Sequence, residues 1–254
     1  MRKTVILTLI FSLVQASLVF AGKDELPSGT AFNKMILPSS AAMVGELVKT
    51  TDAKFLAANI SETAPQSMYG FSTAVSEEQG SFKLGIVLAD LKIYLQAGER
   101  EQVINSLSTL AATMVELGAP VPMISSVVNL NSAVKEGTDL AAINLAGLAV
   151  LTPFIEAFVE KEGKTVFMRF GEWSETTRLA AVAGQEGKSQ VIVAILQGIN
   201  PAGYFLTELK DQGLPAGAAA SLNTLAELGT ATELGKREIR KALKEINNVI
   251  QMMG

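Results

Sequence analysis

Two segments of the chain share one pattern of apolar positions bounded by glycines. Residues 84–98 (LGIVLADLKIYLQAG) and 170–184 (FGEWSETTRLAAVAG) each place two glycines thirteen positions apart around a helical stretch. In the first segment one helix face carries leucines at i, i+4, i+7 and i+11: Leu84, Leu88, Leu91 and Leu95. Isoleucines make the other side of this helix apolar too, so we expect it to be largely buried and to end at Gly98. The second segment is expected to form the equivalent helix, bounded by Gly184.

The similarity between the two halves continues beyond these segments. Each is followed by a Gly-X-Pro turn, a second glycine turn and a long helical pattern. The corresponding turns are Gly118-Ala-Pro120 with Gly213-Leu-Pro215, and Glu136-Gly-Thr138 with Leu228-Gly-Thr230. We therefore predict an all-α protein with a tandem duplication of a roughly four-helix unit, residues 81–163 and 164–254, in a helical bundle or helical-repeat architecture.

The N-terminus has the features of a secretory signal peptide. A short basic start is followed by an apolar run, and residues 19–21 (VFA) form a small-residue cleavage pattern. We predict cleavage after Ala21 and a periplasmic or secreted mature chain, with an uncleaved membrane anchor as the alternative. Residues 22–80 are expected to hold one helix, over 39–58, and an irregular segment.

The stretch Leu140–Ile155 carries no charged residue and is the most hydrophobic part of the predicted mature chain. A Thr138-Asp139 cap precedes it. Its sixteen residues fall short of the roughly 20 that span a bilayer, so we predict a core helix kinked near Pro153 and no stable transmembrane segment. A transmembrane helix is the alternative.

Two features of the second half bear on its function. Residues 198–203 (GINPAG) add glycines and a proline that should break a helix, at a place suited either to a specific function or to a tolerated loop. The last predicted helix, 230–253, is amphipathic, with a charged outer side. We interpret its basic run as a solvated face, with binding to anionic lipid as the alternative.

Composition excludes several classes of function. The chain has neither cysteine nor histidine, which removes disulfides, thiolate and imidazole metal sites, and cysteine or Ser-His nucleophiles. Loss of Arg2 and Lys3 with the leader lowers the formal net charge from −4 to −6, so nucleic acid is an unsuitable partner. We expect no metal and no cofactor.

Few residues suggest catalysis. Ser132 and Lys135 have the S-x-x-K spacing of serine-lysine acyl enzymes, without the companion motifs. The paired acids Glu160 with Glu162 and Glu172 with Glu175 are interpreted as charges on helix surfaces. The sequence thus indicates a protein that is not an enzyme.

The decapeptide 169–178 (RFGEWSETTR) is the strongest candidate for a binding site. It contains the chain's single tryptophan, Trp173, and places Glu175 three residues before Arg178 on one helix face. The matching helix of the first half carries Asp90 and Tyr94. If both helices line a cleft between the units, these residues could bind a ligand; otherwise Trp173 fills the core beside an ion pair.

Asn144, inside the uncharged stretch, completes the predicted ligand-binding set. We expect an exported, non-enzymatic helical binding protein, carrying a hydrophobic small molecule or lipid in a groove between the repeats. The alternative is a helical scaffold that binds another protein of the cell envelope. A carrier requires an enclosed apolar cavity, whereas a scaffold requires a solid core and an exposed apolar patch.

Overall fold

The computed structural model describes residues 40–60, 76–197, 200–231 and 233–254. Within these ranges the regular structure is helical and contains no strand, so the all-α prediction is confirmed. The predicted leader, residues 1–21, and most of the predicted irregular segment lie outside the described residues.

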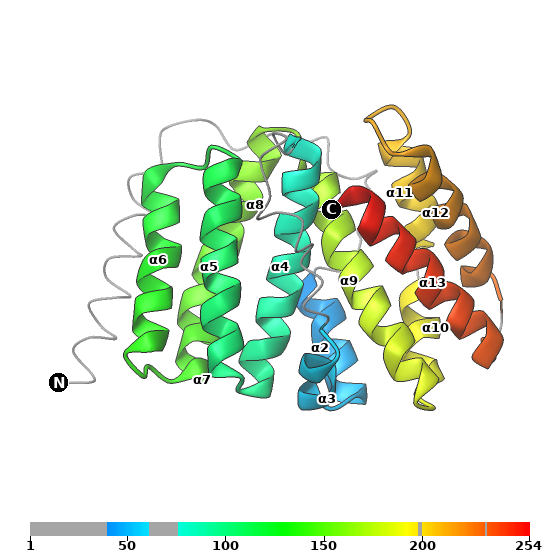
Figure 1. Cartoon of the computed structure of the whole chain (residues 1–254), viewed down its shortest axis with the longest axis horizontal. Coiled ribbons are helices and arrows are strands. Elements are labelled where there is room, and N and C mark those ends of the chain that lie inside the picture. The colour runs from blue at the N-terminus through cyan, green and yellow to red at the C-terminus, as the bar shows by residue number, and fades with distance from the viewer. Residues whose placement is uncertain (1–39, 61–75, 198–199, 232) are drawn as a thin grey trace, which may run out of the picture.

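The helices pack side by side in an elongated molecule (Figure 1). They follow the chain in this order: α2 (Ser40–Thr50), α3 (Ala53–Ala58), α4 (Glu77–Ala97), α5 (Arg100–Glu116), α6 (Val121–Lys135), α7 (Leu140–Ala142), the π-helix η3 (Ile143–Leu148), α8 (Ala149–Lys161), α9 (Thr165–Gln185), α10 (Ser189–Gln197), α11 (Pro201–Leu209), α12 (Ala216–Gly229) and α13 (Lys236–Met253).

Helices α4 and α9 form the centre of the molecule. Helices α5 to α8 lie on one side of this pair and α10 to α13 on the other, while α2 and α3 pack against the central pair (Figure 1). Twelve consecutive residues of α9, 170–181, are buried, so this helix has no solvent-facing side along that stretch. The burial of α4 was predicted, because its sequence is apolar on two faces.

Local signals explain where α4 begins and ends. The Ser76 side chain accepts a hydrogen bond from the backbone of Gln79, whose side chain accepts one from the backbone of Ser76. This capping box satisfies two backbone donors at the helix start. Gly98 adopts φ 79°, the left-handed conformation that ends a helix. Gly184, by contrast, lies inside α9, and the positive φ falls on Gly187; the predicted end at Gly184 was early.

Other predicted boundaries also need correction. The single helix predicted over 39–58 is two helices, because the Asp52 side chain accepts a hydrogen bond from Lys54 and starts α3. The last helix begins at Lys236 rather than residue 230. The break predicted within 198–203 is confirmed: α10 ends at Gln197, and Asn200, at φ 50°, caps α11.

The long uncharged helix has a different irregularity from the one expected. The Asp139 side chain caps it, as predicted, by accepting a hydrogen bond from Ala141. Its backbone widens into a π-helix at Ile143–Leu148, whereas Pro153 lies inside regular α8. The π-helical turn includes Gly147, where a Cβ would lie 2.6 Å from a methyl carbon of Leu130 in α6. The close contact with α6 therefore occurs in the π-helical turn.

Candidate functional site

Helices α4 and α9 cross in direct contact at two glycines. A Cβ added to Gly85 would lie 1.9 Å from the carbonyl oxygen of Met168, and one added to Gly171 would lie 1.9 Å from that of Phe82. The contacts are reciprocal, because 86 positions separate Gly85 from Gly171 and also Phe82 from Met168. At this crossing, backbone meets backbone and no open cleft separates the helices.

A buried ion pair lies beside the crossing. Nε of Arg178 donates to Oε2 of Glu175 at 2.8 Å, and Nη2 donates to the other carboxylate oxygen. Both terminal nitrogens of Arg178 also donate to the carbonyl oxygen of Asn59, each at 3.1 Å. Asn59 is the C-cap of α3, whose last carbonyls lack helical partners. Arg178 therefore ties α3 to the central pair.

A second buried ion pair joins the two central helices. Nζ of Lys92 in α4 lies 3.4 Å from Oε1 of Glu172 in α9. Lys92 and Arg178 are again 86 positions apart. The prediction that Glu172 and Glu175 are surface charges was wrong: each is only 3% exposed, because α9 is enclosed on all sides.

Asp90 completes this group, which we call the charge cluster: Asp90, Lys92, Glu172, Glu175 and Arg178. It contains three carboxyl groups and two cations, so it is neutral when one carboxyl is protonated. Asp90 as a whole is half-buried, but its Oδ1 atom is inaccessible to solvent and has no hydrogen-bond partner among the described residues. Burial raises the pKa of Asp90 well above its ordinary value; the Glu175 charge raises it further and Arg178 lowers it. Asp90 therefore keeps its proton to a higher pH than an ordinary aspartate.

The remaining predicted site residues lie in two places. Tyr94 is buried on α4, one turn beyond Asp90. It lies close enough to Arg178 to help raise the pKa of that guanidinium. Trp173 is 1% exposed and packs against Phe170 and Phe205, with ring centroids 6.2 and 5.4 Å away. Asn144 belongs to η3, outside the charge cluster. The alternative in which Trp173 fills the core beside an ion pair is the one observed.

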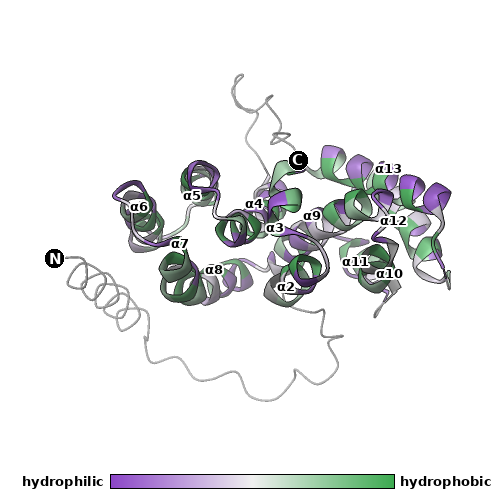
Figure 2. Ribbon diagram, turned by 90° about the horizontal axis from the view of Figure 1, so that it is seen from below, coloured by the Kyte–Doolittle hydropathy of each residue, from purple (hydrophilic) through white to green (hydrophobic). Residues whose placement is uncertain are grey.

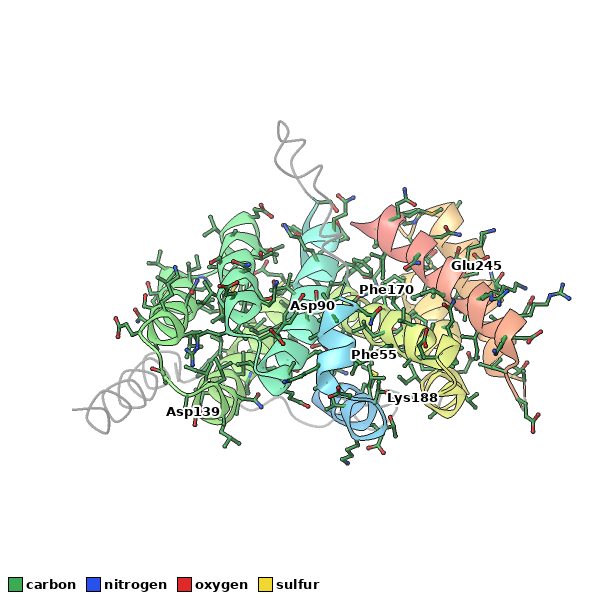
Figure 3. The ribbon with its side chains drawn as sticks, turned by 60° about the horizontal axis from the view of Figure 1, so that its bottom comes forward. Phe55, Asp90, Asp139, Phe170, Lys188 and Glu245 are labelled. Atoms are coloured by element: carbon green, nitrogen blue, oxygen red, sulfur yellow. The ribbon has the colours of Figure 1, made fainter. Side chains whose placement is uncertain are left out.

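The charge cluster can store a proton and hold three helices together. Figure 3 places Asp90 and Phe170 near the middle of the molecule, between its two halves. In the described part of the chain, no group of three or more acidic, histidine or cysteine side chains is arranged to hold a metal ion. Ser132 and Lys135 are both exposed on α6, away from the charge cluster. The charge cluster therefore joins α3, α4 and α9 at the centre of the molecule.

A separate candidate lies on the surface, along the helix formed by α7, η3 and α8. This 22-residue helix, Leu140–Lys161, is the only described one long and apolar enough to span a membrane, by length and composition. Only a third of its most apolar window is buried. Leu145 is 76% exposed, and neighbouring α6 exposes Val121 and Val128. We call the exposed side of α7, η3 and α8 the apolar face; Figure 2 shows these helices coloured as hydrophobic.

Sequence reasoning missed two elements of these sites. The backbone carbonyl of Asn59 gave no signal, because carbonyl groups are the same in every residue. The exposure of the helix Leu140–Lys161 was missed because the uncharged pattern of Leu140–Ile155 is equally typical of a core helix. Comparison with known proteins adds no assignment: no protein-family model, no curated protein and no solved structure matches the chain.

Proposed function

We propose that this protein is a non-enzymatic helical scaffold that binds another protein through its apolar face. The observation that carries the proposal is that Leu140–Lys161 is hydrophobic enough for a membrane span, while the described residues bury only a third of its most apolar window. Monomeric soluble proteins rarely leave a continuous apolar surface of this kind without a partner.

The interior of the molecule favours a scaffold over a carrier. The described core is one contiguous cluster that runs from α2 to α13. Trp173, Phe170 and Phe205, in the region expected to hold a ligand, fill the space with one another. A lipid-sized ligand would need this aromatic packing to open, whereas a protein partner can dock on the apolar face without any rearrangement.

The partner is proposed to present its own apolar helix or hairpin. The apolar face carries no charge from Leu140 to Ile155, while Glu156, Glu160 and Lys161 follow at its end. An uncharged centre with charges at the end resembles the anatomy of protein interfaces, where the core is depleted in charged residues. Export to the cell envelope, with cleavage after Ala21, is part of the proposal.

A tandem duplication would explain the layout of the central pair. Three pairs of equivalent positions, Gly85 with Gly171, Phe82 with Met168 and Lys92 with Arg178, lie at or beside the crossing with one offset of 86. Pro120 and Pro215 start α6 and α12 with nearly equal backbone angles, ψ 136° and 138°. The last helices of the two units pack differently, because α13 packs extensively on α9 and α12 whereas α8 makes smaller contacts with α6 and α9. On this proposal the divergence of α8 produced the apolar face.

The test is native mass spectrometry of the mature protein purified from its own cell envelope. A stoichiometric protein adduct that is lost in Leu145→Asp and kept in Asn105→Asp supports the scaffold. Both variants add one charge at an exposed position, the first on the apolar face and the second on α5. A lipid-sized adduct kept in both variants would instead support the carrier. An apo mass under all conditions would contradict both proposals.

A further inference from the structure

Helix α13 carries a concentrated row of positive charge. Five exposed cations occupy its first half: Lys236, Arg237, Arg240, Lys241 and Lys244. At 100° per residue they span an arc of about 140°, centred opposite the buried side of the helix. That buried side is formed by Ile239, Ala242, Ile246, Val249 and Met253. We call these five cations the basic face.

The two carboxylates of this segment do not neutralise the basic face. Glu238 and Glu245 lie on one flank of the helix, between the cations and the core. Oε2 of Glu245 accepts hydrogen bonds from Ser221 at 2.8 Å and Asn248 at 3.3 Å. Glu238 folds back over Gly235 at the helix start. None of the five cations forms a salt bridge with any described residue.

Folding stability does not explain this arrangement. Like charges four residues apart, as in Lys236 with Arg240 and Arg240 with Lys244, destabilise a helix. Cations in the first turn also oppose the helix dipole, which favours negative charge there. The chain as a whole is acidic, with a net charge of −4. A row of unpaired cations in the unfavourable half of the helix therefore indicates an anionic partner.

We propose that the basic face binds the anionic surface of a lipid membrane. The five side chains are long, flexible and mounted on the convex outer side of one straight helix, so they can reach a flat surface together. An acidic peptide would be gripped better by a concave site with fixed, paired donors, which the outer side of a single helix does not offer. Since most of the molecule is acidic, this face would also fix the orientation of the bound protein.

The position of α13 is compatible with the proposed scaffold. In Figure 1 α13 lies in front and α8 behind, and Figure 2 places the two helices in opposite layers of the molecule. A protein held on a membrane by the basic face would therefore keep its apolar face directed away from the lipid. The two surfaces act independently, so either proposal can fail without the other.

The experiment is flotation of the purified mature protein with lipid vesicles. Vesicles of phosphatidylcholine with about one third phosphatidylglycerol should bind the protein at low salt and release it at about 500 mM NaCl, where screening is strong. Vesicles of phosphatidylcholine alone should not bind it. Arg240→Gln with Lys244→Gln should weaken binding about 30-fold, from about fivefold for each basic side chain near an anionic surface.

The matched control is Lys54→Gln with Lys135→Gln, which removes the same charge from exposed positions outside α13. This variant should bind like the wild type. Equal loss in both double variants would overturn the proposal, because binding would then follow net charge alone. Equal binding to neutral vesicles would overturn it as well and would point to the apolar face. Absence of vesicle binding, with salt-sensitive binding to polyglutamate, would assign the basic face to an acidic polypeptide and also refute the membrane proposal.

Discussion

The glycines at the crossing of α4 and α9 allow a sharp test of the central packing. Replacing Gly85 with alanine adds one methyl group whose carbon would lie 1.9 Å from the Met168 carbonyl oxygen and 2.8 Å from the Glu172 backbone nitrogen. Ordinary contact begins at 3.4 Å, so the two helices must separate by about 1.5 Å. Neither clashing atom can rotate away, because both belong to the backbone of a buried helix.

The expected loss of stability is large. Overpacking a core usually costs about 1–3 kcal/mol, and here the relief must move a whole helix rather than a side chain. Separation would also stretch the charge cluster and loosen the contacts of Phe82 and Phe170, whose centroids are 5.1 Å apart. We therefore expect Gly85→Ala, and likewise Gly171→Ala, to lower the free energy of unfolding by about 3–5 kcal/mol.

Two other glycines provide graded controls. Gly45 lies within α2 with no heavy atom within 4 Å of an added Cβ, so Gly45→Ala should stabilise the protein by about 0.5–1 kcal/mol through helix propensity. A Cβ at Gly217 meets only the flexible end of Met252, at 2.5 Å from its sulfur, and should have an effect within about 1 kcal/mol.

Urea unfolding followed by the emission of Trp173, the only tryptophan, measures all four variants. A Gly85→Ala midpoint equal to that of Gly45→Ala would refute the close approach of the two helices.

Three further outcomes are expected from the charge cluster and the apolar face. Because the pKa of Asp90 is raised in the folded protein, stability should fall as pH rises above the ordinary value of 3.8; Asp90→Asn should flatten this part of the urea-midpoint profile and increase stability at neutral pH. Arg178→Met leaves the Glu175 carboxylate buried without its partner and should cost about 3–5 kcal/mol in urea unfolding, whereas the double variant with Glu175→Leu should recover most of that loss. Leu145→Ser should change stability by less than about 0.5 kcal/mol, and Leu151→Ala, at a buried position of the same helix, should cost about 2–5 kcal/mol; equal effects in thermal unfolding would show that the apolar face is covered.

The sequence predicted those parts of the fold that local physics decides. The helical pattern and Gly98 located the end of α4, and Asp139 located the start of α7, because capping depends on residues a few positions apart. The spacing of two glycines in each half identified the helices that turned out to be central. It could not reveal that Gly85 and Gly171 meet, since the same residue at another position serves as a helix end.

The burial of the acids was beyond local reasoning. Glu172 and Glu175 are charged residues within a helical pattern, and a polar helix face is normally exposed to solvent. What buries them is the enclosure of α9 by helices from both halves of the chain, which is a long-range property. Conversely, the uncharged pattern of Leu140–Ile155 predicted a core helix, and the described residues bury only a third of the most apolar window of the helix that contains it.

The charge cluster and the glycine crossing depend on each other. Two helices in contact through glycines have a smooth interface, and apolar contacts alone would tolerate sliding or rotation. On α9, Glu172 and Glu175 lie within about one helical turn of Gly171, and Arg178 lies about two turns from it. A shift of about 5.4 Å along the axes would pull Lys92 of α4 away from its partner Glu172. An uncompensated buried charge is strongly unfavourable, so the cluster penalises the slipped arrangement more than it stabilises the correct one. We therefore interpret these buried charges as the feature that fixes the register of α4 against α9, which the glycines alone leave undetermined.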